Sequence, residues 1–397
     1  MKSIGGLTLQ GVENQHIICI SSIDWDPIWT RKQQIMSRLP KSNTILYIEP
    51  PITLISPLKD RTALSKWGMW FKGLRRISEN IYLYSSPIVL PFGNKSRLIN
   101  KINQWWISLF LNKIISRLKL KNPIIWTYMP TSVDLVERLP SHKLLVYDCV
   151  DEHTEYTGLI NKALVTDMER QLMDQCGLVF VTAQGLFKAK KDFAREIYFL
   201  PNAANVEHFM KAQDPATVIP ADIANIPGPI VGFVGVIQDW IDLDLVEAAA
   251  LAHPEWSFVM IGPVAAGIDT SSLKSLPNVT FLGRKDVKDL PSYIKAFDVC
   301  INPFKMNELT DKVSPLKFYE YLASGKPIVS VNMPGVKDFF DVVEISNNTA
   351  EFITGIERAL TNETPEKLQA RLCRARENSW DSRAEFMQEK ILPKINS

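Results

Sequence analysis

The stretch that indicates the fold most directly is residues 314–329, which read SPLKFYEYLASGKPIV. Ser314 and Pro315 suit an N-cap followed by the first position of a helix, and nothing before Gly325 interrupts that helix. Gly325 then predicts a left-handed C-cap, and the apolar run after it predicts a strand at residues 328–331. A helix start of this kind offers free backbone N–H groups and a positive dipole, and both favour binding of a diphosphate.

Two charged side chains lie in the first turns of this predicted helix. Lys317 is placed to add positive charge near the helix start, and Glu320 lies one turn further along. A carboxylate at that position is able to accept hydrogen bonds from a ribose diol. The alternative is an ordinary core helix between two strands, with Glu320 facing solvent.

Short apolar runs alternate with helical patterns on the N-terminal side of this stretch, which is typical of doubly wound α/β domains. The predicted strands are residues 16–22, 44–48, 123–127, 143–147, 177–182, 197–200, 230–234, 257–261, 279–282 and 299–301. Residues 57–77 read as irregular. At 397 residues the chain is long for one core, so two domains are expected. We place the first at 1–205, completed by a C-terminal helix at 379–397, and the second at 206–378.

Charge is distributed unevenly along the chain. Residues 1–125 hold 18 Lys and Arg against 6 Asp and Glu, whereas residues 126–397 hold 27 against 37. The first part is therefore strongly basic and the remainder acidic, although the net charge of the whole chain is only +2. A basic front end favours contact with an anionic surface, such as acidic lipid, nucleic acid or a polyanionic substrate.

The pattern of residues 97–118 predicts a helix with one polar stripe and a broad apolar face, which includes Trp105 and Trp106. Basic side chains gather at its end: Lys113, Arg117, Lys119 and Lys121. Tryptophans, cations and a wide apolar face are typical of a helix that lies in a membrane interface. The alternative is a core helix whose last turn carries cations that suit its dipole. A nucleic-acid partner is not expected, because the apolar face suits lipid better.

Several classes of protein are excluded or disfavoured. The five cysteines form no CxxC pair, which argues for a reducing compartment and against structural zinc. No glycine fingerprint of a nicotinamide enzyme follows the first strand. Asp24-Trp25-Asp26 spells a short metal-binding pattern, but nothing else supports it, so no metal site is expected. The chain shows neither a signal peptide nor a run of the ~18 apolar residues that a spanning helix needs. We therefore expect a cytoplasmic protein, peripheral at the inner face of the cell membrane.

The pattern Pro-Leu-Lys-x-x-Glu-Tyr-x-Ala-x-Gly-Lys-Pro at residues 315–327 resembles the donor-nucleotide motif of GT-B glycosyltransferases. Residues 232–235, 256–262 and 279–284 are similar to further segments of that group, and its bacterial polysaccharide and teichuronic-acid type members look most alike. The resemblance implies an α/β fold of two Rossmann-like domains, with the acceptor bound by the first domain and a nucleotide sugar, UDP-linked, by the second. It implies donor contacts from Gly235, Arg284, Lys312, Ser314, Pro315, Leu316, Lys317 and Glu320.

The sequence also departs from that pattern. Many retaining members carry a second glutamate eight residues before the position of Glu320, where this chain has Lys312. The usual basic pair after the glycine loop is missing too, and Gln238, Asp239 and Trp240 occupy that region. The resemblance to retaining enzymes is weaker for this reason, and the phosphate charge is expected to be met mainly by the helix start, Lys317 and Lys312.

An inverting reaction needs a carboxylate that takes the proton of the acceptor hydroxyl. Asp151, after a predicted strand, is the first candidate, and Asp24 is the second; the alternative is that Asp151 caps a helix. The expected function is transfer of a sugar from a nucleotide-diphosphate donor to a polysaccharide or lipid-linked saccharide acceptor, without cofactor or metal. The alternatives are a nucleotide-sugar epimerase of the same fold and an inactive, membrane-docked partner of a transferase.

Overall fold

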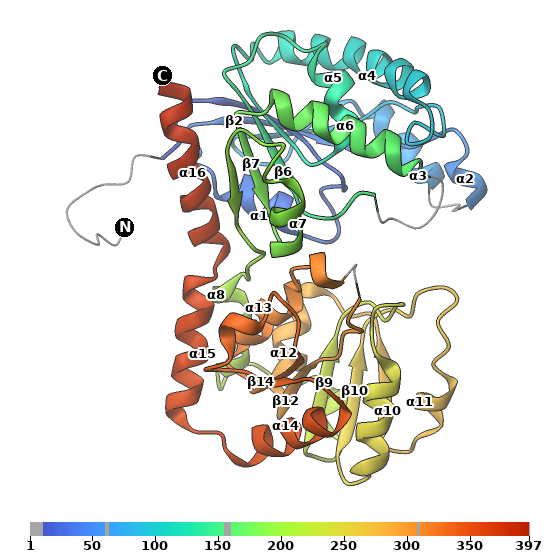
Figure 1. Cartoon of the computed structure of the whole chain (residues 1–397), viewed down its shortest axis with the longest axis vertical. Coiled ribbons are helices and arrows are strands. Elements are labelled where there is room, and N and C mark those ends of the chain that lie inside the picture. Colours follow the sequence, from blue (N-terminus) through green and yellow to red (C-terminus); the bar gives the residue numbers. More distant parts are fainter. Residues whose placement is uncertain (1–10, 60–62, 155–159, 308–309, 397) are drawn as a thin grey trace, which may run out of the picture. The chain divides into compact units, whose positions relative to one another are not determined.

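The computed structural model describes residues 11–59, 63–154, 160–307 and 310–396, and they form two compact units (Figure 1). Unit 1 comprises residues 1–200 together with 383–397, and unit 2 comprises residues 201–382. Each unit contains a largely parallel sheet with helices on its faces. The predicted pair of doubly wound α/β units is therefore confirmed.

The sheet of unit 1 has the strand order β3-β4-β2-β1-β5-β6-β7-β8. Every neighbouring pair is parallel except β3 and β4, which are antiparallel. The order reverses at β1, which pairs with β2 on one side and with β5 on the other. The strands are β1 (His16–Ile20), β2 (Thr44–Glu49), β3 (Leu74–Arg76), β4 (Ile81–Ser85), β5 (Ile124–Thr127), β6 (Leu144–Cys149), β7 (Leu178–Val181) and β8 (Ile197–Phe199).

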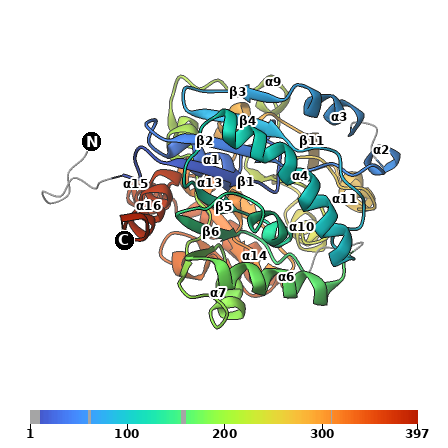
Figure 2. The same ribbon diagram turned by 90° about the horizontal axis from the view of Figure 1, so that it is seen from above.

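Helices cover the two faces of this sheet. Three of them pack on one face against alternate residues of β1, β2, β5 and β6: α4 (Arg97–Arg117), α5 (Val133–Val136) and α6 (Lys162–Gln175). Figure 2 shows α4 and α6 lying on the near side of the sheet. On the other face, Trp126, Phe180 and Tyr198 stack in a row, and Phe386 of α16 (Trp380–Asn396) contacts Tyr198. The remaining helices are α1 (Arg31–Arg38), α2 (Ser56–Lys59), α3 (Ala63–Phe71) and α7 (Gln184–Lys190).

The sheet of unit 2 is fully parallel, with the order β11-β10-β9-β12-β13-β14. The order reverses at β9, so its carboxyl end and that of β12 mark the place where open α/β sheets bind ligands. The strands are β9 (Ile230–Val234), β10 (Ser257–Ile261), β11 (Val279–Gly283), β12 (Val299–Asn302), β13 (Ile328–Val331) and β14 (Glu344–Ser346).

Two hydrophobic cores flank this sheet, because the side chains of β9 alternate between its faces. Ile230 and Val234 pack with α12 (Leu290–Lys295) and α13 (Leu316–Ser324), whereas Val231 and Phe233 pack with α10 (Leu243–Ala252) and α14 (Thr349–Thr361). The other helices are α8 (Val206–Phe209), α9 (Ala221–Ala224), α11 (Ser271–Ser275) and α15 (Pro365–Glu377).

The structure corrects one segment of the predicted layout. Residues 57–77 were expected to be irregular, but they contain most of α2, all of α3 and strand β3. Trp70 of α3 packs edge-to-face against Phe110 of α4, with 5.6 Å between ring centroids. Because this contact joins residues forty positions apart, a local pattern of alternating Trp and Lys does not reveal the helix.

Candidate active site

The loop after β9 lies at the switch point of the unit 2 sheet and is tied to both neighbouring strands. Gly235 N–H donates to the carbonyl of Ile261 at the end of β10, at 2.8 Å. Asp242 N–H donates to the carbonyl of Pro303 after β12, at 2.7 Å. Gly262 has φ +145°, and a Cβ atom there would lie 1.8 Å from the Gly235 carbonyl oxygen. The loop is therefore held close against its neighbours, and glycine is required at position 262.

Helix α13 begins beside this region, and its first turn differs in detail from the prediction. The helix starts at Leu316 with Pro315 as the N-cap residue, so Ser314 is not the N-cap. The Ser314 hydroxyl instead accepts a hydrogen bond from Asn202 N–H at 3.0 Å, and the Ser314 carbonyl accepts one from the Asn202 amide at 2.9 Å. No side chain among the described residues caps the helix, and Phe318 N–H donates to the Pro315 carbonyl at 3.2 Å. The preceding N–H groups, of Leu316 and Lys317, make no hydrogen bond within the described residues and can serve another acceptor. The predicted left-handed C-cap at Gly325 is confirmed, with φ 72°.

Lys317 and Glu320 form an ion pair on the first turns of α13. The ammonium group of Lys317 lies 2.6 Å from a carboxylate oxygen of Glu320. Glu320 is only 7% exposed, so the alternative of a solvent-facing glutamate is wrong. The pair brings a cation and a carboxylate together near the uncapped helix start. These are the groups that a diphosphate and a ribose diol require.

Tyr321, a motif residue with no predicted role, joins α13 to β9. The hydroxyl of Tyr321 accepts a hydrogen bond from Val234 N–H at 2.7 Å and donates to the Val234 carbonyl at 3.3 Å. Burial raises the pKa of this hydroxyl well above its usual value, so it remains a neutral donor. Tyr321 therefore fixes the middle of α13 relative to Val234, the residue before Gly235.

The two other predicted donor residues lie on different segments. Arg284 is exposed and directly follows β11, which is two strands away from β9 in the sheet. Lys312 ends a single 3₁₀ turn at residues 310–312 and precedes Ser314 by two residues. The structure thus places Lys312 close in sequence to the start of α13, while Arg284 lies at the edge strand.

The catalytic candidates lie at the carboxyl edge of the unit 1 sheet. Asp24 is half-buried after β1, and its carbonyl accepts a hydrogen bond from the Gln33 amide at 2.8 Å. Asp151 is exposed, two residues beyond the end of β6. It does not cap the next helix, because the N-cap of α6 is Asn161. β5 lies between β1 and β6, so the two carboxylates follow strands that are two apart in the sheet.

Buried cations surround this edge, and the sequence analysis did not identify them. Arg31 pairs with Asp148 at 2.9 Å, with both side chains at most 2% exposed. Burial lowers the pKa of the neighbouring Lys32, and the Asp151 carboxylate acts in the opposite direction. Lys190 pairs with Glu169 at 2.7 Å. Arg31 and Lys32 open helix α1, 11 and 12 residues after the end of β1, and nothing in the local sequence marks these two cations as buried.

Among the residues that the structure describes, no group of three or more His, Cys, Asp or Glu side chains is arranged to hold a metal ion. Asp24 and Asp26, the pair in the short metal-like pattern, differ in environment, because Asp24 is half-buried and Asp26 is exposed.

Comparison with known proteins agrees with this geometry. Residues 228–362 match the family described as Glycosyl transferases group 1. The chain is 27% identical over 279 residues to TuaH of Bacillus subtilis (strain 168), named as a teichuronic acid biosynthesis glycosyltransferase; the match covers 65% of this chain and 68% of that protein.

Solved structures share the fold across nearly the whole chain. Sucrose-phosphate synthase from Thermosynechococcus elongatus matches with a TM-score of 0.66 at 15% identity, covering 96% of this chain and 98% of that one. An E. coli trehalose-6-phosphate structure bound with UDP-2-fluoro glucose matches with a TM-score of 0.68 at 14% identity, covering 96% and 99%. HepE of Anabaena, in complex with UDP and glucose, matches with a TM-score of 0.61 at 13% identity, covering 96% and 100%.

Fold and matched domain define the class: the protein has the GT-B fold. More particularly, residues 228–362 in its second unit match the group 1 glycosyl transferases, and the chain is similar to TuaH. The epimerase and inactive-partner alternatives are not favoured by these relatives.

Proposed function

We propose that this glycosyltransferase moves a sugar from a UDP-linked donor to a polysaccharide or lipid-linked saccharide acceptor at an anionic membrane surface. The observation that carries the membrane assignment is the exposed apolar face of helix α4, whose buried side holds Asn100, Asn103 and Gln104 beside Ile107 and Leu111. The donor assignment is supported by the start of α13 and by solved structures with this fold that contain UDP or a UDP-sugar analogue.

The proposed chemistry depends on where charge develops on the substrates during the reaction. Glycosyl transfer passes through an oxocarbenium-like state while negative charge grows on the departing diphosphate. The uncapped N–H groups of α13, with Lys317 and Lys312, would stabilise that charge more in the transition state than in the ground state. Asp151, or Asp24 in its place, would take the proton of the acceptor hydroxyl. Because cations already meet the phosphate charge, the reaction proceeds without a divalent metal.

Helix α4 turns four of its amide and hydroxyl side chains inward. The buried polar residues lie on one side of the helix, at the spacing of successive helical turns: Asn100, Asn103, Gln104 and Ser108. Ile107 and Leu111 join them and enter the core of unit 1. The alternative that residues 97–118 form a core helix is therefore correct only for this inward-facing stripe of α4.

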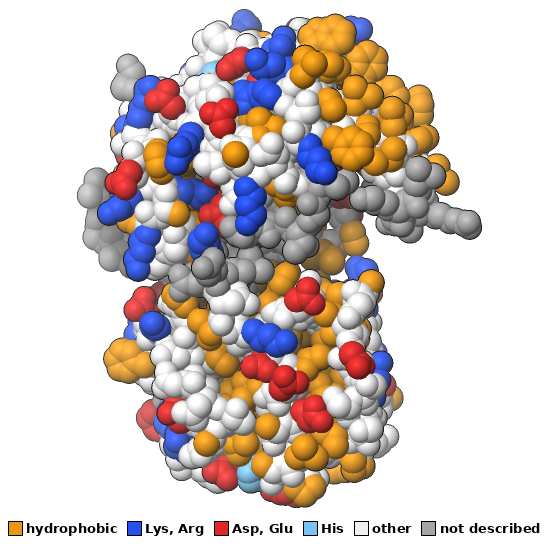
Figure 3. Space-filling model, turned by 45° about the vertical axis from the view of Figure 1, so that its right-hand side comes forward, with side chains coloured by type: hydrophobic (Ala, Val, Ile, Leu, Met, Phe, Trp, Pro, Cys, Tyr) orange, Lys and Arg blue, Asp and Glu red, His pale blue; other side chains and the backbone are white. Residues whose placement is uncertain are grey.

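The opposite face of α4 is exposed and apolar. Leu98 is 69% exposed and Trp105 47%, and Phe71 at the end of α3 is 77% exposed. The packing of Trp70 on Phe110 joins α3 and α4 into one surface, which we call the apolar face; its other exposed members are Leu64, Ile102, Trp106 and Leu109. Figure 3 shows hydrophobic side chains gathered at the upper right of the molecule. Contiguous exposed apolar surface of this kind marks an interaction site.

Exposed cations border the apolar face at the end of α4. Lys113, Arg117, Lys119 and Lys121 are all exposed, and the ammonium group of Lys113 lies 5.9 Å from the ring centroid of Phe110. Each cation near an anionic lipid surface contributes ~1 kcal/mol, and the attraction falls off within a Debye length. The described helices include none that is long and apolar enough to cross a membrane. Together these features support binding in the plane of a membrane interface.

Vesicle sedimentation tests this proposal. We expect the full chain to bind phosphatidylglycerol vesicles at low salt, to bind neutral phosphatidylcholine vesicles weakly, and to be released as salt rises. Replacing Lys113, Arg117, Lys119 and Lys121 by Glu should abolish binding. The control carries the same charge change at exposed lysines elsewhere: Lys188, Lys191, Lys337 and Lys367. Equal loss in the control, or no binding by the wild type, would remove the membrane assignment.

A further inference from the structure

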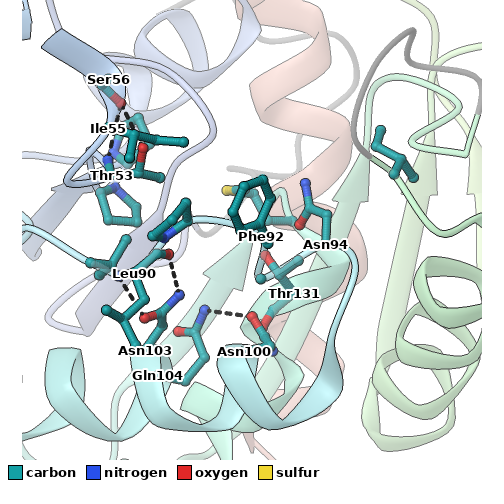
Figure 4. Close-up of a pocket in the computed structure, with 17 residues that line it drawn as sticks. Thr53, Ile55, Ser56, Leu90, Phe92, Asn94, Asn100, Asn103, Gln104 and Thr131 are labelled. Atoms are coloured by element: carbon teal, nitrogen blue, oxygen red, sulfur yellow. Dashed lines mark hydrogen bonds between the residues drawn. The ribbon is translucent and has the colours of Figure 1, made fainter. Parts of the chain in front are cut away.

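Unit 1 contains a pocket of about 500 Å³ at the carboxyl edge of its sheet (Figure 4). Pro50 and Pro51, directly after β2, form one wall, and residues 89–94, in the segment after β4, form another. Met129 and Thr131 after β5 and the first two turns of α4 complete it. Ligands of open α/β sheets bind outside the carboxyl ends of the strands, and this pocket has that position.

The described side chains that form the pocket wall are uncharged. None of the described residues that line the pocket carries a charged side chain. The polar members are carboxamides and hydroxyls, and the remainder are prolines, aliphatic side chains and Phe92. A small set of neutral polar groups on an otherwise apolar wall suits a ligand that is polar but not ionic. A carboxylate or phosphate bound here would lose its hydration without gaining a counter-charge.

Two of the carboxamides hold the wall in place and are not free for a ligand. The Asn103 side chain donates to the Leu90 carbonyl and accepts from Leu90 N–H, both at 2.9 Å. The Asn100 amide donates to the Thr131 carbonyl at 3.0 Å and to the Asp134 carboxylate at 2.6 Å. Asp134 is in turn paired with Arg97 at 2.9 Å, which offsets its charge behind the pocket wall.

Three other polar side chains of the wall retain hydrogen-bonding capacity. Gln104 uses only its amide N–H, in a long 3.3 Å bond to Asn100, and its carbonyl oxygen has no partner among the described residues. The Thr131 hydroxyl and the Asn94 carboxamide likewise make no side-chain hydrogen bond within the described part of the chain. Amides and hydroxyls both donate and accept, and so do the hydroxyls of a neutral sugar.

Phe92 adds an aromatic surface to the wall. It is 43% exposed and has φ 70°, a left-handed conformation that is strained for a bulky residue. The segment keeps that conformation through hydrogen bonds from Lys95 N–H and Ser96 N–H to the Phe92 carbonyl, at 2.9 and 3.1 Å. Strain of this kind gathers at ligand sites. A sugar ring presents an apolar C–H face that suits packing on an aromatic ring, while its hydroxyls reach the amides.

Helix α4 connects this pocket with the apolar face. Asn100, Asn103 and Gln104 point to the pocket from one side of the helix, and Leu98 and Trp105 are exposed. If the apolar face rests on lipid, the pocket lies one helix diameter, ~10 Å, from the membrane surface. That distance suits a sugar carried on a lipid.

We propose that this pocket binds an uncharged saccharide unit of the acceptor. The inference rests on the proposed function and narrows it, because it selects neutral over acidic or phosphorylated sugars at this position. Gln104, Thr131 and Asn94 bind the hydroxyls, and Asn100 and Asn103 are positioning residues for the wall.

Ligand-observed saturation-transfer NMR on the full chain tests the proposal. The probes are methyl β-glucoside and N-acetylglucosamine, which are neutral, and glucuronic acid, which is anionic. Thr131→Val removes one hydroxyl without changing the shape of the side chain, and Gln104→Leu removes a carboxamide. Each should weaken neutral-sugar binding about tenfold, as expected for one or two lost hydrogen bonds. The control is Gln175→Leu, an exposed glutamine of α6 outside the pocket.

Calorimetry with UDP on the same variants separates this inference from the proposed function. Unchanged UDP affinity in Thr131→Val and Gln104→Leu would show that the donor unit is intact and that the loss is specific to the pocket. Neutral-sugar binding that survives both changes, or glucuronic acid binding as well as the neutral probes, would overturn the inference. A wild type that binds neutral sugars but not UDP would instead contradict the donor assignment and leave the pocket supported.

Discussion

At the scale of single residues, the donor hypothesis concentrates on Glu320. Its carboxylate is buried and accepts a short hydrogen bond from Lys317, so a bound ribose would have to share or replace that partner. The pair is close enough to the uncapped helix start for both members to face one ligand. A substitution at Glu320 therefore distinguishes a donor-binding role of this ion pair from a purely structural one.

Glu320→Ala should weaken UDP binding by ~1.5–3 kcal/mol, the range for a hydrogen bond to a charged group. Isothermal titration calorimetry measures this directly. Glu366→Ala, at an exposed glutamate of α15, is the matched control and should leave affinity unchanged. A folded Glu320→Ala protein with wild-type UDP affinity would rule out the ribose role.

Tyr321 gives a second prediction at this scale. Tyr321→Phe leaves the buried Val234 N–H without its acceptor, which should destabilise unit 2 by ~1–3 kcal/mol. Urea unfolding measures the change. Tyr82→Phe is the control, since its hydroxyl makes no hydrogen bond with the described residues. Equal stability of the two variants would mean that the bond between α13 and β9 contributes nothing.

At the scale of elements, α4 shows what an amphipathic pattern leaves undecided. The sequence divides its residues into a polar and an apolar side, but it does not say which side faces the protein. A helix usually buries its apolar side. Here Asn100 donates to the Thr131 carbonyl after β5, and Asn103 bonds to the Leu90 backbone after β4, 31 and 13 residues away in the sequence. The inward direction is therefore a tertiary property.

The orientation of α4 predicts unequal effects of substitutions along one helix. Trp105→Gln should change the free energy of unfolding by no more than ~0.5 kcal/mol, because its ring is exposed. Trp106→Gln should cost ~1 kcal/mol, because its ring also packs edge-to-face on Phe110. Leu111→Ala should cost ~2–5 kcal/mol, because that side chain is fully buried. Denaturant unfolding compares the three variants. A large loss from either tryptophan change would show that the rings pack in the core.

Other elements were predicted correctly from the sequence pattern alone. Buried parallel strands read as short apolar runs, so 230–234 and 257–261 were predicted with the observed bounds of β9 and β10. Gly325 ended α13 because its left-handed conformation is unfavourable for other residues. Helix α3 was missed because its stability comes from Trp70 packing on α4 rather than from its own pattern. The unit 1 pocket was missed because its walls come from segments that are far apart in the sequence.

At the scale of the whole molecule, the two units divide the proposed chemistry. Unit 2 offers the helix start, the Lys317–Glu320 pair and the glycine loop, which suit a nucleotide diphosphate. Unit 1 offers Asp151, the uncharged pocket and the apolar face, which suit an acceptor on a membrane. The basic and acidic parts of the sequence match the two units only roughly. Unit 1 also contains acidic residues after position 125, such as Asp148 and Glu169, which form buried ion pairs with Arg31 and Lys190.

Metal dependence is a prediction about the complete reaction. If the helix start and the lysines meet the phosphate charge, sugar transfer should continue in excess EDTA at a rate within about twofold of the untreated enzyme, a difference of roughly 0.4 kcal/mol in barrier. Turnover with and without EDTA is the comparison. Complete loss of activity that Mg²⁺ or Mn²⁺ restores would show that a metal supplies the charge instead.

The most direct test of the central claim is nucleotide release from a panel of nucleotide sugars by the full chain, with saccharide acceptors present. The account predicts that UDP is released from at least one UDP-sugar in an acceptor-dependent manner, and that Glu320→Ala lowers this activity at subsaturating donor. Release of no nucleotide from any donor, by protein shown to be folded, would contradict the account.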